Sequence, residues 1–205
     1  SLAQGVTRRV APRDGAAPNG DSEANAISAD GRFVLLTSSS DHWTAMDQNG
    51  ASDVFLYDRE REEATLLSRS LRGSAGNGRS LGRDLSPDGR YAVYSSVASD
   101  LTPDDDNEGW DVFVWDRQTG ATDRVSMGPG DQQQNPVSGN HAHISADGRF
   151  VSFHSQSDQL VPDADGASFD VFLVDRQLGT TTKVSKTPGG MATDGDTFVL
   201  GMSDD

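Results

Sequence analysis

Three stretches of the chain are rich in Asp and Asn and offer oxygen ligands for a metal ion. They run from Asp47 to Asp53, from Asp104 to Asp111 and from Asp163 to Asp170, and each ends on an Asp. Calcium takes about six to eight hard oxygen ligands, including backbone carbonyls, on a flexible turn. The pattern therefore predicts that these loops bind calcium. The candidate ligands are Asp47, Asn49, Asp53, Asp104, Asp106, Asp111, Asp163, Asp165 and Asp170.

The same residue types also have a purely structural interpretation. Asp, Asn and Gly populate hairpin loops, and a closing Asp can cap a turn with its carboxylate. The spacing resembles the front of an EF-hand loop but lacks the bidentate Glu of that motif. A calcium site here would be weak, with a dissociation constant of roughly 10⁻⁴–10⁻³ M, and tightest in the second stretch, which has the most carboxylates.

Two tryptophans, Trp43 and Trp110, lie in or beside the acidic stretches. An exposed Trp on a loop is a frequent contact for a protein partner, and burial beneath the loop is the alternative. The chain has no Gly-x-Ser-x-Gly elbow, Walker loop or dinucleotide fingerprint, and it has no cysteine. No residue is therefore predicted to be catalytic.

The elements that position these residues repeat along the chain. The motif Ser-x-Asp-Gly-Arg begins at Ser28, Ser86 and Ser145, at spacings of 58 and 59 residues (28 to 86 and 86 to 145). The sequence Asp-Val-Phe recurs at Asp53, Asp111 and Asp170 with the same spacings. Two markers with one period indicate an internal repeat, which is typical of solenoids, propellers and arrays.

One repeat contains four short strands. In the second copy they are expected near Leu81–Leu85, Arg90–Ser95, Asp111–Asp116 and Thr122–Ser126. The Asp-Gly pair before the second strand is a strong turn signal, because Gly adopts a positive φ without a steric penalty. Four antiparallel strands make one propeller blade, and no helical periodicity competes. We therefore predict an all-β propeller with three complete four-stranded blades.

A second candidate site lies on the first strands, which line the central channel of a propeller. His141 and His143 are two positions apart, so they point to one face of their strand. Asp84 holds the position that matches His143 in the preceding repeat. These groups could bind a transition metal or transfer protons. The alternative is that they are polar residues facing water, since two His ligands alone seldom make a metal site.

The repeat also divides the chain. Thr7–Val10 matches a fourth strand and Thr197–Ser203 matches a first strand, so we expect partial blades at both ends. The chain would then be part of a larger ring, or several copies would assemble. The reason is that unpaired terminal strands expose backbone groups that tend to pair with another chain. The predicted segments are 1–21 (trailing strand), 22–79, 80–137 and 138–196 (blades), and 197–205 (first strand of a following blade).

The registered motifs Ser-x-Asp-Gly-Arg-aromatic, Asp-Val-Phe-x-x-Asp-Arg and Thr-x-x-Val-Ser resemble the WD40-like repeat of TolB-type β-propellers. The resemblance covers nearly the whole chain. It implies a propeller, usually exported in bacteria to the periplasm or beyond, that binds proteins or accompanies an enzyme domain. Members of this family differ widely in function, so the fold alone does not decide it.

The amino-acid composition excludes some classes of binding partner. The net charge of −15 repels phosphate backbones and anionic lipid, so we expect neither nucleic acid nor membrane insertion. No signal peptide is recognisable in this chain. We expect a non-enzymatic binding or scaffolding module with a protein partner, or copies of itself as a homo-oligomer that completes the propeller. The alternatives are a hydrolase or lyase with a metal or His site at the channel, and a structural fragment without independent function.

Overall fold

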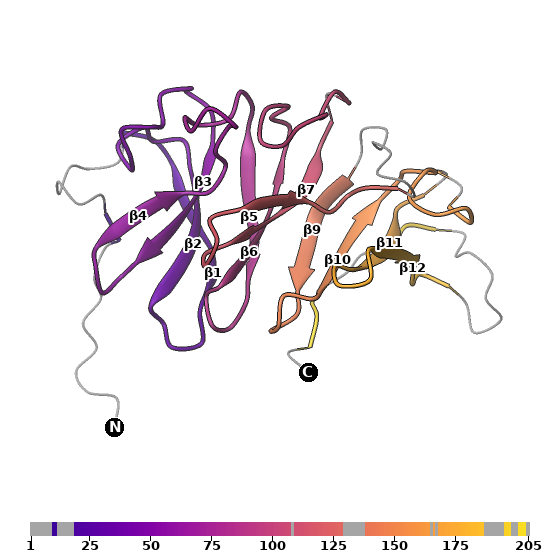
Figure 1. Ribbon diagram of the computed structural model, residues 1–205. Coiled ribbons are helices and arrows are strands. Elements are labelled where there is room, and N and C mark those ends of the chain that lie inside the picture. The colour runs from indigo at the N-terminus through magenta and orange to yellow at the C-terminus, as the bar shows by residue number, and fades with distance from the viewer. Residues whose placement is uncertain are drawn as a thin grey trace.

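The computed structural model describes residues 10–11, 19–107, 109–128, 138–164, 166, 168–186, 195–197 and 201–203. These residues form three four-stranded antiparallel sheets, each built from strands that follow one another in the chain (Figure 1). The first sheet contains β1 (Ser22–Ile27), β2 (Phe33–Ser38), β3 (Asp53–Asp58) and β4 (Glu63–Leu66). The second contains β5 (Ser80–Leu85), β6 (Tyr91–Ser96), β7 (Asp111–Asp116) and β8 (Thr122–Arg124). The third contains β9 (Ser138–Ile144), β10 (Phe150–Ser155), β11 (Asp170–Asp175) and β12 (Thr180–Lys183).

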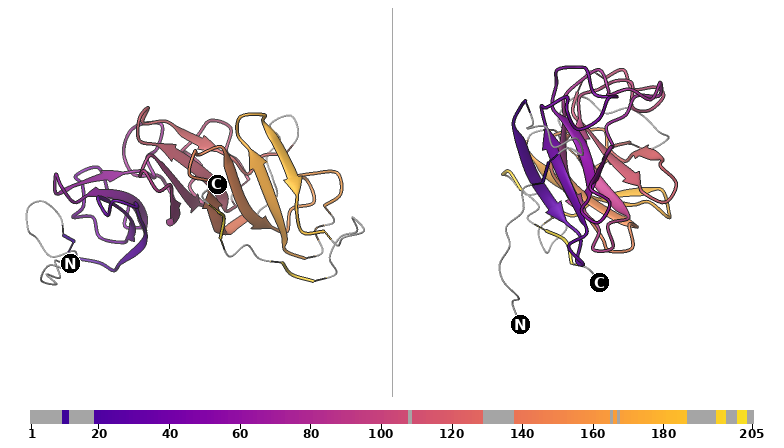
Figure 2. Two further views of the ribbon diagram at one scale, coloured as in Figure 1. Left: turned by 90° about the horizontal axis from the view of Figure 1, so that it is seen from below. Right: turned by 90° about the vertical axis from the view of Figure 1, so that its left-hand side faces the viewer.

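The sheets are propeller blades that stand side by side, from the indigo first blade to the orange third blade (Figure 2). The first strands β1, β5 and β9 contact one another in sequence, as the inner strands of neighbouring blades do. The part of the chain that the structure describes contains no helix that could cross a membrane. The predicted fold class, an all-β propeller with three four-stranded blades, is confirmed.

The ends differ from the prediction. Val10 packs against the core of the first blade without being part of a strand. Thr7–Arg9 and residues 198–200 lie outside the described residues. Thr197 and residues 201–203 are not in a strand, so the strand expected at Thr197–Ser203 is wrong for these positions. A strand needs a neighbour to pair with, and the Thr197 amide bonds instead to the Phe169 carbonyl, at 2.7 Å.

The repeated motif forms the turn between the first two strands of each blade and ties that turn to the third strand. In the second blade, Ser86 Oγ donates to Asp88 (2.7 Å) and accepts from the Tyr91 amide (2.9 Å). Arg90 donates to both carboxylate oxygens of Asp116, at 3.1 and 3.0 Å, and these bonds hold the pKa of that carboxyl below its usual range. The equivalent pairs in the other blades are Arg32–Asp58 and Arg149–Asp175. The repeated charges are therefore structural.

A second repeated contact joins one blade to the next, and we call it the blade joint. Phe33 lies against Gly89, where φ is +68° and a Cβ would overlap the ring. The guanidinium of Arg117, also in the second blade, sits 4.3 Å from the centroid of the Phe33 ring. Such cation–π contacts favour Arg over an aromatic face. Between the second and third blades the same three positions are held by Tyr91, Gly148 and Arg176.

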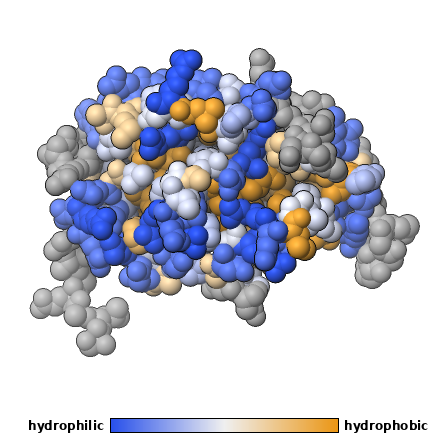
Figure 3. Space-filling view, in the orientation of Figure 1, coloured by the Kyte–Doolittle hydropathy of each residue, from blue (hydrophilic) through white to orange (hydrophobic). Residues whose placement is uncertain are grey.

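The apolar core lies mainly between the sheets. One cluster joins the first and second blades and includes Leu35 and Tyr94. Another joins the second and third blades and includes Val114 and Phe153. The strands are buried on both faces where blades meet, which explains their nearly continuous runs of apolar residues. The outer surface seen in Figure 3 is mostly hydrophilic, in keeping with the net charge of −15.

Candidate functional site

The closing Asp of each acidic loop is buried and accepts a hydrogen bond from a serine just beyond the fourth strand of its blade. We call this Asp–Ser pair the latch. Asp53, Asp111 and Asp170 are each at most 2% exposed. In the first blade, Ser68 Oγ donates to Asp53 (2.6 Å) and accepts from the Val54 amide (3.0 Å), so the second residue after β4 is tied to the start of β3. The same serine bonds recur at Ser126 with Asp111 and at Ser185 with Asp170. The closing Asp thus has a structural contact, which is with a serine hydroxyl and not with the backbone of its own turn.

In the third blade the other carboxylate oxygen of the latch faces a buried cation. Lys183 Nζ lies 2.6 Å from Asp170 Oδ2, and both side chains are almost fully buried. Asp163 pairs with Lys186 at 2.6 Å nearer the surface. The hydrogen bond from Lys186 lowers the pKa of Asp163. Asp165 lies outside the described residues.

In the second blade a buried arginine takes the equivalent position. Arg124 Nη1 lies 2.8 Å from Asp105 and 3.9 Å from Asp111 Oδ2, which also accepts a hydrogen bond from Asn107 (2.8 Å). Burial nevertheless raises the pKa of Asp105 to about 6, because one guanidinium serves two neighbouring carboxylates. Asp104 contributes its backbone carbonyl to Arg124 (2.9 Å), and Asp106 is exposed.

In the first blade no basic side chain takes this place. Asn49 Nδ2 donates to Asp53 Oδ2 (2.7 Å) and to the Gly76 carbonyl (2.8 Å). Asp47 is 1% exposed and its Oδ2 receives no hydrogen bond. Burial raises the pKa of Asp53 to about 7 and also raises that of Asp47. The three acidic loops are therefore electrostatically different, although their sequences are similar.

Calcium binding in these loops stays a prediction. Among the described residues, no group of three or more His, Asp or Glu side chains is arranged to hold a metal ion. A calcium site there would have to draw on amide and backbone oxygens as well as carboxylates, which suits this ion.

The channel candidates lie on neighbouring inner strands. His143 Nδ1 on β9 is 3.3 Å from Asp84 Oδ2 on β5, and the same carboxylate oxygen accepts the Ile144 amide (3.1 Å). His141 has a different neighbour, because its ring centroid lies 5.0 Å from that of His154 on β10. The structure thus brings Asp84 and His143 together and directs His141 toward His154.

Sequence reasoning did not select His154 as part of this group. Its side chain is buried, and burial lowers its pKa to about 4, with the nearby His141 as a further cause. A sequence signal for the burial of His154 was its place in a strand, β10, where it is flanked by the apolar core residue Phe153 and the buried Ser155. A neutral, buried His between core residues is typical of a packing role.

The two tryptophans have different environments. Trp43 is only 6% exposed, and its ring packs against Phe55 and Tyr57 at centroid distances of 6.1 Å each. Its equivalents one and two repeats later are Leu101 and Leu160, both buried. Trp43 is therefore buried beneath the loop and is not an exposed partner contact. Trp110 is partly exposed and remains a candidate partner contact.

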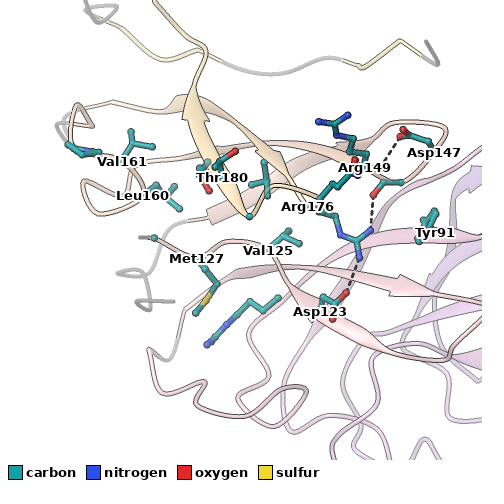
Figure 4. Close-up of a pocket in the computed structure, with 18 residues that line it drawn as sticks. Tyr91, Asp123, Val125, Met127, Asp147, Arg149, Leu160, Val161, Arg176 and Thr180 are labelled. Atoms are coloured by element: carbon teal, nitrogen blue, oxygen red, sulfur yellow. Dashed lines mark hydrogen bonds and ion pairs between the residues drawn. The ribbon is translucent and has the colours of Figure 1, made fainter. Parts of the chain in front are cut away.

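A groove of roughly 800 Å³ lies between the second and third blades, and Arg124 is among the residues that line it (Figure 4). Val125, Met127, Leu160 and Val161 contribute apolar surface to it. Arg176 spans one end, because its guanidinium bonds to Asp123 (2.9 Å) and to the Gly148 carbonyl (2.7 Å). None of the predicted site residues lines this groove.

Comparison with known proteins supports the fold. No family model matches the chain, and no curated protein matches it in sequence. A putative TolB from Agrobacterium tumefaciens aligns with a TM-score of 0.50 at 17% identity, over 78% of this chain and 45% of that one. TolB from Acinetobacter baumannii aligns with a TM-score of 0.49 at 18% identity, over 82% of this chain and 32% of that one.

An oligogalacturonate lyase in complex with manganese aligns with a TM-score of 0.47 at 17% identity, over 85% of this chain and 42% of that one. This chain spans less than half the length of each of these three proteins. Together, the sheet topology and the structural similarity identify the architecture as three blades of a TolB-like β-propeller.

Proposed function

We propose that this protein is a non-enzymatic scaffolding module that binds other propeller blades through its end faces, with a second copy of the chain as its partner. The observation that carries the proposal is that the first and third blades expose the two complementary halves of the blade joint. Each half already has its counterpart inside the chain, where the geometry of the completed contact is known.

The third blade offers the aromatic half. Phe150 is equivalent to Phe33 and Tyr91, and the guanidinium of its own Arg149 lies 4.7 Å from its ring centroid. Phe33 and Tyr91 each receive a second guanidinium from the following blade. Within the described residues, Phe150 has no such second contact. The ring therefore offers a free face to a glycine and an arginine of another blade.

The first blade offers the glycine and arginine half. Gly31 has a φ of +72°, and the only side-chain atom near its open side is Nη1 of Arg59. Arg59 also donates to the Gly31 carbonyl, as Arg117 and Arg176 do to their own glycines. In the described part of the chain, no aromatic ring lies on this pair. A Phe150 from a second copy fits that position.

The blade count favours a pair of chains. Closed propellers typically have about four to eight blades. Two copies of these three blades supply six blades (3 + 3), which lies within this range. Closed two-fold assemblies are also the commonest homo-oligomers.

The experiment is the molar mass in solution by light scattering over a range of concentrations. We expect a species of about twice 21.8 kDa that dissociates on dilution. Phe150→Ala and Arg59→Ala should each shift the midpoint of dissociation at least tenfold to higher concentration. Leu71→Ala, which trims another exposed apolar side chain (65% exposed), is the matched control and should leave the midpoint unchanged.

Mixing the two variants sharpens the test. A pair formed from one Phe150→Ala chain and one Arg59→Ala chain contains one unmodified joint, so the mixture should form more dimer than either variant alone. A chain that stays monomeric throughout overturns the second copy as partner. A dimer that none of these substitutions weakens shows association through another surface.

The inner strands are the surface that such a scaffold would present to a further protein partner. Glu23 and His141 on these strands are exposed, and Asp84 and His143 are partly exposed. The family resemblance supports a periplasmic or extracellular location in bacteria. Hydrolase or lyase activity at the channel is the alternative, supported by the contact between Asp84 and His143.

A further inference from the structure

The three copies of the repeat act as internal controls for one another at the acidic loops. One position on the fourth strand pairs with the Phe two residues after the closing Asp of its own blade, and it is held by Leu66, Arg124 and Lys183 in turn. In the third blade, one buried Asp faces Lys183. In the second, two buried Asp residues share Arg124. The number of buried acids and the supply of positive charge therefore change from blade to blade.

Like the second blade, the first blade buries two acids at this site, and among the described residues no basic side chain forms an ion pair with either of them. Asp47 is equivalent to Asp105 and Asp53 to Asp111, so this blade keeps both acids of the second blade. Leu66 stands where the other blades have a basic residue, and it is 2% exposed. Burying two carboxylates without a counter-charge is costly, so something must compensate.

The atoms around this position already suggest a coordination site. Oδ2 of Asp47 is buried and accepts no hydrogen bond, while Asp53 Oδ2 and the Gly76 carbonyl both point at Nδ2 of Asn49. Lys183 Nζ contacts the equivalent oxygen in the third blade. Turning the Asn49 amide over would place its oxygen among the others, at the expense of the hydrogen bond that this oxygen now accepts from the Ala51 amide (2.7 Å).

We propose that the loop of the first blade, and not those of the second and third, binds one calcium ion through Asp47, Asn49, Asp53 and the Gly76 carbonyl. Calcium suits this set because it accepts carboxylate, amide and backbone oxygens in irregular geometry. The ion supplies the positive charge that Arg124 and Lys183 supply elsewhere. The proposal is independent of whether two copies associate.

The first test is calcium binding by calorimetry on the full chain after removal of metal with EDTA. We expect one calcium ion per chain and a rise in melting temperature with added calcium chloride. Asp47→Asn should weaken binding at least tenfold. Asp106→Ala and Asp163→Ala change exposed acids of the other two loops and should leave both readings unchanged.

A charge-replacement variant makes the test specific. Leu66→Lys places an ammonium group where the third blade has one, so it should abolish calcium binding and raise the melting temperature in EDTA. Leu66→Met keeps the position apolar and is the control, which should bind calcium as the unmodified chain does. Circular dichroism shows whether both variants fold. If Leu66→Lys does not fold, the result for Asp47→Asn decides the question.

Two results would overturn the proposal. If the unmodified chain binds no calcium while Leu66→Lys is stabilised in EDTA, a proton rather than a metal ion compensates the two acids. If calcium binds but Asp106→Ala or Asp163→Ala weakens it as much as Asp47→Asn does, the ion lies in another loop.

Discussion

Asp53 and Asp170 hold equivalent positions in two blades but face different neighbours. Asp170 contacts Lys183, whereas Asp53 accepts hydrogen bonds from the uncharged donors Ser68 and Asn49 and lies beside the carboxyl of Asp47. Burial dominates at Asp53 and raises its pKa to about 7. At the residue scale, charge compensation thus depends on one fourth-strand residue and not on the acidic motif.

This difference predicts a pH dependence of stability in EDTA. The folded pKa of Asp53 lies above its unfolded value of about 4, so the folded state binds the proton more tightly. The stabilisation is complete below pH 4 and is lost as the pH rises through 7. Urea unfolding should show a decrease on the order of 1–3 kcal/mol between pH 5 and 8 that Asp53→Asn, which cannot ionise, does not share.

Comparing the unmodified chain with Asp53→Asn removes the effects of groups that do not contact Asp53, whereas Asp47, whose carboxyl interacts directly with that of Asp53, is part of the same effect. His154, whose pKa is lowered to about 4, acts in the opposite direction, because its stabilisation is lost as the pH falls through that value. Asp105, with a pKa near 6, acts in the same direction as Asp53. Both contribute equally to the two proteins, so parallel pH profiles would contradict the role of Asp53.

At the scale of the element, the latch between the third and fourth strands explains why a short edge strand stays in place. β12 has four residues, and Ser185, two residues beyond its end, donates to Asp170 (2.7 Å) and accepts from the Val171 amide (3.1 Å). A single buried hydroxyl thus satisfies one acceptor and one backbone donor. Such a bond counts for more than its pairwise energy because removal leaves both partners unsatisfied.

Ser185→Ala should therefore lower the free energy of unfolding by about 1–3 kcal/mol. Thr182→Ala alters a neighbouring, exposed hydroxyl of β12 and is the control, for which we expect a change below about 0.5 kcal/mol. Equilibrium urea unfolding measures both. Equal effects of the two substitutions would mean that the latch adds nothing to the stability of the blade.

At the scale of the whole molecule, the blades are coupled through the blade joint and the apolar clusters between sheets. Gly148 of the third blade must lack a side chain, because a Cβ there would overlap the ring of Tyr91 in the second. Its φ of +73° adds a second requirement for glycine. The joint thus depends on residues that belong to different blades.

Gly148→Ala tests the joint, with Gly179→Ala as its control. Gly179 has a φ of +65° but nothing near its open side, so alanine there adds only backbone strain of about 1–2 kcal/mol. Gly148→Ala should cost about 1–3 kcal/mol more, because the Tyr91 ring must also move. Thermal and urea unfolding provide both numbers. Equal losses would show that the ring moves aside without cost.

Much of this architecture is predictable from the chain alone. The period of the Ser-x-Asp-Gly-Arg and Asp-Val-Phe markers predicts three blades, since turn residues and strand-forming runs act locally. The same register aligns Trp43 with Leu101 and Leu160, a signal for burial that was available before the structure. Thr197 matches a strand in the repeat but is not part of one, because pairing depends on a neighbour and not on local pattern.

The sequence by itself determined the strands, the turns and which residues of the three blades are equivalent, because these follow from local backbone preferences and a regular period. Only the tertiary structure decided what equivalent residues do. It placed Arg124 and Lys183 against the closing Asp of their blades, left Leu66 at the equivalent position of the first blade, and brought Phe33 onto Gly89 of the next blade. Burial and charge compensation depend on side chains that are distant in sequence, and folding alone brings these together.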